Sequence, residues 1–129
     1  MNLDSGAIDN VIDRRTGGQF PIRETEMSKA GAYYEAANGS PIPNLGERDV
    51  LGWTNDGIAT AQTFQVADVK GPLGSVRKIC QAGNYVLFDE VGGVIVNKET
   101  GAKTGFTLNE KGVYSLQIWV KKQGFPRQA

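Results

Sequence analysis

Apolar residues occur along this chain in short runs that are separated by polar, glycine-containing segments. The runs are rich in Val, Ile, Tyr, Thr and Phe, and many of the 17 glycines fall between them. Short β-branched and aromatic runs predict strands, and the glycine-containing segments predict the turns that join them. The pattern therefore predicts an all-β chain in which helix is the exception.

Residues 29–53 are predicted to form a hairpin. Asn38-Gly39 divides two extended segments there, and this dipeptide is the strongest short-range hairpin signal. Pro41 and Pro43 follow the turn, and a proline cannot donate a hydrogen bond to a strand ladder. We therefore expect this arm to be an edge or an exposed projection and not a central strand.

Other patterns predict strands on both sides of the hairpin. The apolar residues within positions 8–12 predict a short strand, and a turn at residues 55–57 leads into another one. The apolar positions Ile58, Phe64 and Val66, with Val69 as a further candidate, fit the alternation of a half-buried strand imperfectly. Three or four more strands joined by glycine-containing turns are expected in the last third of the chain, where they form a β-meander.

The segment SVRKICQAG is the best helix candidate. Ser75 can cap its N-terminus and Gly83 can supply the left-handed residue that ends it. The spacing of Val76, Ile79 and Cys80 places these residues on one helix face. We therefore predict one short helix near residues 75–82, with Cys80 as a small buried residue and not a nucleophile.

Length and charge restrict the class of protein. At 129 residues the chain fits one compact domain. Its 14 basic and 14 acidic residues cancel, so no net field attracts nucleic acid or an anionic membrane. No segment resembles a signal peptide, and no apolar run approaches the roughly 20 residues that span a bilayer. We expect an intracellular, cytoplasmic protein with neither a membrane nor a nucleic acid as partner.

Residue types exclude several chemistries. Because the chain has one cysteine and no histidine, it cannot form an internal disulfide, a Ser-His-Asp triad, a Cys-His dyad or an imidazole zinc site. No phosphate-binding glycine motif lies between a strand and a helix. Asp9 and Asp13 fit a solvated or turn pair better than a metal-ligand set. We therefore expect neither a metal nor a cofactor.

The segment LDSGA, residues 3–7, holds the most suggestive carboxylate. Asp, Ser and Gly favour a tight turn, and Asp4 on such a turn could activate water if a second carboxylate shared its proton. The chain holds a single good Asp-Ser-Gly element, so the second carboxylate has to come from another copy. A symmetric homodimer would place two Asp4 residues at its two-fold axis, where they would titrate as a unit.

The order of motifs resembles the retropepsin-like aspartic proteases of long-terminal-repeat retrotransposons. The resemblance is to the Copia type, whose protease runs into a short pre-integrase segment. It covers residues 3 to about 120 and rests on LDSGA, the AANGS hairpin, VADV, LGSVRKICQAGNYVLF, a Gly-Gly strand, NKETGAKTG and GVYSL.

The resemblance implies roles for three groups of residues. Asp4 matches the catalytic aspartate, and Ser5 matches the hydroxyl residue that bonds across the dimer beneath the carboxylates. The other matches are the rest of the active-site turn (Gly6 and Ala7), the flap that closes over an extended peptide substrate (Ala37, Asn38, Gly39 and Ser40), and the apolar turn and helix behind the catalytic loop (Leu73, Gly74, Ser75 and Val76).

The resemblance also implies a fold and a division of the chain. The expected fold is a retropepsin-like closed β-barrel with the short helix near residues 75–82 and the C-terminal meander. Residues 1–90 would form the protease domain, residues 91–121 a pre-integrase-like meander packed on or continuing it, and residues 122–129 a flexible tail. The expected partners are a second copy of the chain and a peptide or polyprotein substrate.

Two functions from different classes follow. The first is an aspartic endopeptidase of a retrotransposon polyprotein that uses Asp4 in a homodimer. The alternative is a non-catalytic β-rich interaction module or degenerate protease fragment. Three observations favour the alternative: only Met1, Asn2 and Leu3 precede the aspartate, Gly74 stands where the family usually has Leu, and the meander exceeds a minimal protease. A third, weaker reading is a single-stranded nucleic-acid-binding barrel that uses its aromatic residues.

Overall fold

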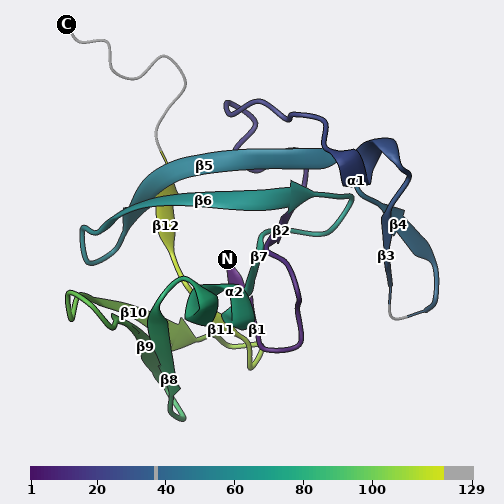
Figure 1. Cartoon of the computed structure of the whole chain (residues 1–129). Coiled ribbons are helices and arrows are strands. Elements are labelled where there is room, and N and C mark those ends of the chain that lie inside the picture. The colour runs from purple at the N-terminus through teal and green to yellow at the C-terminus, as the bar shows by residue number, and fades with distance from the viewer. Residues whose placement is uncertain (37, 121–129) are drawn as a thin grey trace, which may run out of the picture.

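Figure 1 shows the computed structural model, which describes residues 1–36 and 38–120. The chain is mostly β with few helices, as the sequence pattern predicts. The main sheet contains β1 (Asn2–Asp4), β2 (Val11–Ile12), β5 (Gly46–Thr54), β6 (Ala59–Val66), β7 (Leu73–Ser75), β8 (Asn84–Phe88), β9 (Gly92–Asn97), β10 (Lys103–Leu108), β11 (Tyr114–Ser115) and β12 (Ile118–Val120). The remaining elements are β3 (Tyr33–Glu35), β4 (Pro41–Pro43) and the helices α1 (Glu26–Lys29) and α2 (Val76–Gln81).

The main sheet is open. Its ten strands follow the order β12-β5-β6-β2-β7-β1-β11-β10-β9-β8. A barrel closes only where the last strand bonds to the first, and within the described residues β8 pairs with β9 alone. The predicted closed barrel is therefore not found. Figure 1 shows instead the long β5–β6 hairpin lying opposite α2 and β8–β10, with the short strands β1, β2 and β7 between them.

Two parallel pairs place the N-terminal strands in the middle of this sheet. β1 runs parallel to β7, with Asn2 opposite Leu73 and Asp4 opposite Ser75. β2 runs parallel to β6, while β1 also pairs antiparallel with β11. Segments that are far apart in sequence therefore fix the position of β1 from both sides.

Two clusters of apolar side chains form the core. One contains Ile12, Val50, Phe64 and Val66, so the predicted inward positions are confirmed for Phe64 and Val66, whereas Ile58 and Val69 lie outside β6. The other lies between β1 and the C-terminal strands and contains Leu3, Phe106 and Leu116. The turn and the two strands predicted around residues 55–57 are also confirmed, since β5 and β6 pair along their whole length.

The structure confirms helix α2 and corrects one of its residues. The Ser75 hydroxyl accepts a hydrogen bond from the Lys78 N–H at 3.2 Å, and Gly83 has a left-handed φ of 95°. Val76 and Ile79 pack against the Leu3 cluster. Cys80, however, is exposed, so its predicted burial is wrong. The helix has only six residues and contacts the core through Val76 and Ile79. Cys80 follows Ile79 directly, and the helical turn of one residue carries its side chain away from the core toward solvent.

A second helix was not expected from the apolar pattern. The single turn α1 begins after Thr25, whose hydroxyl accepts from the Ser28 N–H while the Ser28 hydroxyl accepts from the Thr25 N–H. This reciprocal capping box stabilises one turn. None of the α1 residues is buried, so no apolar periodicity marks the helix in the sequence.

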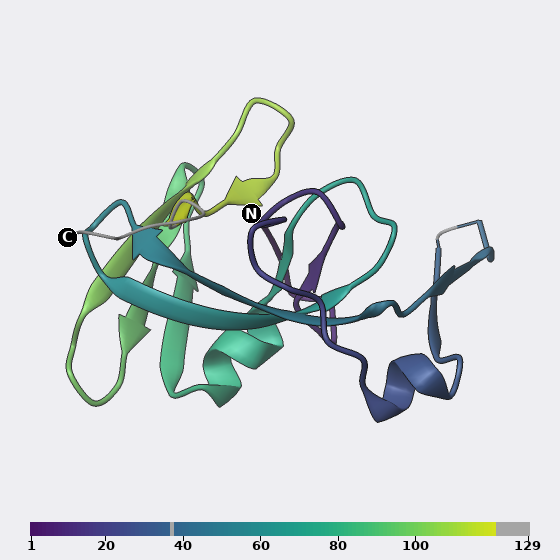
Figure 2. The same ribbon diagram turned by 90° about the horizontal axis from the view of Figure 1, so that it is seen from above.

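The hairpin predicted over residues 29–53 is shorter than expected. Only β3 and β4 form it, as a separate two-stranded sheet that we call the arm. Residues 46–53, which contain no proline, belong instead to β5 and lie inside the main sheet between β12 and β6, so the expected edge position is wrong for them. In the arm, Tyr34 pairs with Ile42, and Gly39 in the turn has a φ of 84°. Figures 1 and 2 show the arm projecting from the rest of the molecule, as the two prolines predict. Position 37 lies outside the described residues.

The C-terminal strands continue the same sheet. β8, β9, β10 and β11 pair in sequence order, which confirms the meander, and β12 returns to pair with β5. The strands of residues 91–120 thus lie on both sides of the block β5-β6-β2-β7-β1, and both parts of the chain belong to one sheet. The expected tail, residues 122–129, lies outside the described residues. In the described part of the chain, no helix is long and apolar enough to cross a membrane.

Candidate active site

The segment Asp4–Ala7 forms a turn at the end of β1. The Gly6 N–H donates to Asp4 Oδ1 at 2.7 Å, and the Ala7 N–H donates to the Asp4 carbonyl at 3.4 Å. Asp4 and Ser5 are both exposed. The carboxylate is therefore held in one orientation by the backbone of its own turn while it stays accessible to solvent.

Gly6 is suited to its position by space. A Cβ atom added there would lie 3.3 Å from Asp4 Oδ1, which is tighter than ordinary van der Waals contact. A larger residue would push against the oxygen that the Gly6 N–H binds. The glycine of the Asp-Ser-Gly motif thus permits the close approach of backbone to carboxylate.

Ser75 fixes this turn from behind. Its side chain is fully buried at 0% exposure, and its hydroxyl donates to the Ala7 carbonyl at 2.6 Å while it accepts from Lys78 N–H. The Ser75 N–H donates to Asn10 Oδ1 at 2.8 Å. One serine therefore connects the turn, strand β7 and the first turn of α2.

The other residues predicted behind the site pack there as well. Leu73 lies opposite Asn2 in β1, and Val76 packs against the Leu3 cluster. Gly74 is buried, and a Cβ added there would lie 3.2 Å from Leu3 Cδ2 and 2.7 Å from Met1 Cε. Leu3 and the flexible Met1 side chain thus occupy the space beside the position where the resembled family usually has Leu.

The tip of the arm is a tight turn. The Gly39 N–H donates to the Ala36 carbonyl at 2.9 Å, and the Ser40 N–H donates to Asn38 Oδ1 at 3.0 Å. Asn38, Gly39 and Ser40 lie together at this tip, and the fourth predicted flap residue, Ala37, lies outside the described residues. Among the described residues of the tip, none forms a hydrogen bond with the Asp4 turn.

The base of the arm is tied to the segment that follows the turn, which the sequence patterns did not indicate. The Tyr34 hydroxyl donates to Asp9 Oδ2 at 3.1 Å, and Asn44 Nδ2 donates to the Tyr34 oxygen at 3.4 Å. Burial and the Asp9 charge raise the pKa of Tyr34 to about 12. On its other side Asp9 Oδ1 lies 3.9 Å from Lys78 Nζ. Asp9 therefore bridges the arm and α2.

Asp13, which the sequence paired with Asp9, has a local role. Its Oδ2 accepts from the Thr16 N–H at 3.1 Å, and this bond helps to lower the pKa of Asp13 against the opposing effect of burial. Within residues 1–36 and 38–120, no three side chains of His, Cys, Asp or Glu converge where they could hold a metal ion. The accessible chemistry of the turn is thus that of one oriented carboxylate per chain.

The comparisons with known proteins returned no match: no family model, no curated protein and no solved structure is significantly similar to this chain.

Proposed function

We propose that the chain is an aspartic endopeptidase domain of a retrotransposon polyprotein, of retropepsin-like fold and active as a homodimer. The observation that carries the proposal is the Asp4 turn, in which an exposed carboxylate accepts the Gly6 N–H at 2.7 Å. The turn is also fixed through Ser75, which lies opposite Asp4 in the parallel β1–β7 pair. The Asp-Ser-Gly sequence, the arm and the capped helix occur in the order of the resembled family.

The reaction needs one protonated and one ionised carboxyl group. The ionised Asp4 takes a proton from water, and the water oxygen bonds to the peptide carbonyl carbon while the protonated Asp4 of the second copy gives its proton to the carbonyl oxygen. When this intermediate collapses, the Asp4 that took the water proton gives it to the peptide nitrogen, the other Asp4 takes a hydroxyl proton from the intermediate, and the C–N bond breaks, which restores one protonated and one ionised carboxyl group. One water is consumed, and a carboxylic acid and an amine are released.

The open edge of β8 can bind a second copy of the chain. This contact is separate from the one that pairs two Asp4 turns, because β9, β10 and β11 lie between β8 and β1 in the sheet. β8 ends the sheet, and its alternate residues Tyr85 and Leu87 are 55% and 57% exposed, while Val86 between them packs against the core. An apolar sheet edge of this kind is a template for pairing with another chain. Two β8 edges joined in antiparallel fashion would place Tyr85 of each copy near Leu87 of the other.

Charges around β8 favour this antiparallel arrangement. Lys98 lies at the Asn84 end of β8, with its Nζ 5.1 Å from the Tyr85 ring centroid. Glu90 follows the Phe88 end and is exposed. A two-fold axis through the centre of β8 would therefore bring Lys98 of one copy toward Glu90 of the other. The same pairing in parallel would bring like charges together.

The alternative function is a non-catalytic interaction module. The same β8 edge motivates it, because an exposed apolar edge can bind any extended strand. A dimer would be compatible with both functions, so cleavage has to decide between them.

The test is cleavage of a polyprotein-derived peptide by the full chain and by Asp4→Asn. We expect Asp4→Asn to lower the rate by about 100-fold or more, because general acid–base catalysis contributes at least that much. The matched control is Asp68→Asn, which removes an exposed carboxylate paired with Arg14 away from the turn. Equal cleavage by Asp4→Asn and the unaltered chain would exclude Asp4 from the mechanism.

A further inference from the structure

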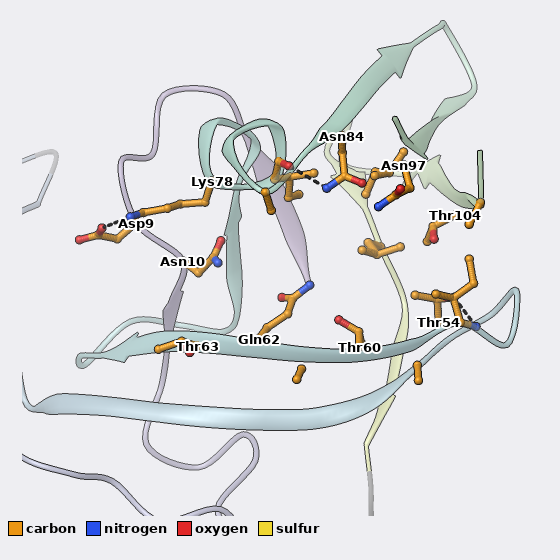
Figure 3. Close-up of a pocket in the computed structure, with 18 of the residues that line it drawn as sticks. Asp9, Asn10, Thr54, Thr60, Gln62, Thr63, Lys78, Asn84, Asn97 and Thr104 are labelled. Atoms are coloured by element: carbon orange, nitrogen blue, oxygen red, sulfur yellow. Dashed lines mark hydrogen bonds and ion pairs between the residues drawn. The ribbon is translucent and has the colours of Figure 1, made fainter. Parts of the chain in front are cut away.

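A cleft of about 640 Å³ lies apart from the Asp4 turn. Figure 3 shows it between the β5–β6 hairpin on one side and α2 with β8–β10 on the other. Its volume lies in the range of ligand sites. Asp4 does not line it, so the proposed catalytic turn does not explain it.

Most of the lining residues that Figure 3 labels have uncharged polar side chains. Figure 3 shows the charged residues Asp9 and Lys78 at one end and the threonines Thr54 and Thr104 at the other. Both threonines are buried, at 7% and 8% exposure. The labelled residues between these ends carry amide or hydroxyl groups: Asn10, Thr60, Gln62, Thr63, Asn84 and Asn97.

One polar atom in the cleft has no partner. Gln62 Oε1 is buried and receives no hydrogen bond from the protein, while Figure 3 shows the Gln62 side chain pointing from β6 into the cleft. A buried acceptor without a donor costs about 1–3 kcal/mol. Such an atom in a native structure calls for an explanation, for which a water molecule or a ligand beside it would serve.

The lining excludes several ligand classes. No aromatic residue lines the cleft, so it offers no stacking surface to a nucleobase. Lys78 is its single cation, and this residue already faces Asp9 at 3.9 Å, so a phosphate or carboxylate finds no free positive charge. The two carboxylates of the lining, Asp9 and Glu47, face Lys78 and Arg23, so a cation finds no free negative charge either. What remains is an uncharged ligand that carries hydrogen-bond donors.

An extended peptide fits these conditions best. Asn and Gln side chains offer both a donor and an acceptor, which match the alternating C=O and N–H groups of a peptide backbone. Aliphatic residues between the polar ones, including Ile58, Ile79 and Ile95, can contact apolar peptide side chains. We propose that this cleft binds an extended, uncharged peptide segment, with the Gln62 side-chain amide as a contact to the backbone of that segment.

The experiment is a titration of the isotope-labelled full chain followed by nuclear magnetic resonance. The chain carries Asp4→Asn so that no probe is cleaved, which keeps the outcome independent of the proposed peptidase activity. The probe is a pool of end-capped heptapeptides built from Ala, Val, Ser, Thr, Asn and Gln. We expect resonance shifts at Asn10, Gln62, Asn84 and Thr104. Shifts located elsewhere, or no binding at all, would overturn the proposal.

Gln62→Leu tests the central contact. We expect it to weaken peptide binding about tenfold, and to raise the thermal midpoint of the free chain because an unpaired buried acceptor is removed. The matched control is Gln81→Leu, the same change at an exposed position outside the lining. Unchanged affinity in Gln62→Leu would contradict the proposal.

Two further experiments make the test decisive. If Gln62→Leu does not fold, Ala102→Trp replaces it, because Ala102 is exposed at the rim and a large ring there should block the cleft and abolish binding. Unchanged affinity in Ala102→Trp would overturn the proposal. The second experiment replaces the peptides by maltoheptaose, in which every hydrogen-bond donor is a hydroxyl group. Binding of the sugar in place of the peptides would overturn the peptide assignment.

Discussion

At the residue scale, two short hydrogen bonds define the candidate site. Gly6 N–H orients the Asp4 carboxylate at 2.7 Å, and the Ser75 hydroxyl holds the Ala7 carbonyl at 2.6 Å. The first is local to the motif, whereas the second joins residues 68 positions apart. The orientation of the carboxylate therefore depends on a serine that is not part of the Asp-Ser-Gly motif.

Ser75→Ala tests this dependence. It removes the cap of α2 and leaves the Ala7 carbonyl without its donor at a fully buried position. We expect the free energy of unfolding to fall by about 1–3 kcal/mol, measured by denaturant titration. Ser40→Ala is the control, because Ser40 is exposed at the tip of the arm and should change stability little. A loss in Ser75→Ala no larger than the control would show that Ser75 does not support the turn.

At the element scale, the fold separates into parts that local sequence predicts and parts that it does not. The arm turn and helix α2 were predictable because Asn38-Gly39 and Ser75 act on their own neighbours. The parallel pairing of β1 with β7 was not predictable, because it joins segments that are distant in sequence, and neither segment contains a local sequence pattern that indicates its partner. The burial of Cys80 was predicted wrongly for the same reason. Helix periodicity indicates which residues share a helix face, but only tertiary packing decides how much of that face other residues cover.

The same limit applies to the site. The motif indicated Asp4 and its turn, and the helix signal indicated Ser75 as a cap. The bridge from Tyr34 through Asp9 toward Lys78 could not be read from the sequence, since it depends on how the arm and α2 meet. The sheet edge at β8 likewise follows from strand order, which strand patterns alone do not specify.

Arg23 ties the loop before α1 to strand β5 and predicts a pH dependence. It donates to Glu47 and Asp49 at 2.7 Å each. Hydrogen bonds from Arg23 and Thr63 lower the pKa of Asp49, and those from Gln65 and Arg23 lower the pKa of Glu47. Because both values are lowered in the folded state, the stabilisation is present above the unfolded pKa of about 4 and is lost as pH falls through the folded pKa.

We therefore expect the thermal midpoint to fall when the pH is lowered from 5 toward 2, and Arg23→Gln to flatten this fall. Circular dichroism melts across that range measure it. Arg77→Gln serves as the control, because Arg77 is exposed on α2 and should leave the slope unchanged. The assignment fails if Arg23→Gln shows the same slope as the unaltered chain.

At the scale of the whole molecule, the account requires two copies because each chain supplies one Asp-Ser-Gly carboxylate. The open edge at β8, with its exposed Tyr85 and Leu87, cannot be this contact, because three strands lie between β8 and β1 and would keep the two Asp4 carboxylates apart. We assign to this edge a second contact between copies, independent of the one at the Asp4 turns. The opposite end of the sheet, β12, is also an edge and carries Val120 at 40% exposure. The two edges thus provide a matched pair of positions.

Leu87→Lys should weaken the contact at β8, since it places a charge on each side of an apolar strand contact. Analytical ultracentrifugation should show weaker self-association, while peptide cleavage, which depends on the Asp4 turns, should stay unchanged. Val120→Lys makes the same change at the other edge and should leave self-association unaltered. If Val120→Lys and not Leu87→Lys weakens self-association, this contact lies at β12.

The most direct measurement of the central claim is the rate of peptide cleavage per chain as a function of total chain concentration. If each active site takes one Asp4 from each of two copies, the rate per chain rises with concentration while the chain is mostly monomeric and then reaches a plateau. A rate per chain that stays constant down to concentrations where sedimentation shows only monomer would contradict the account.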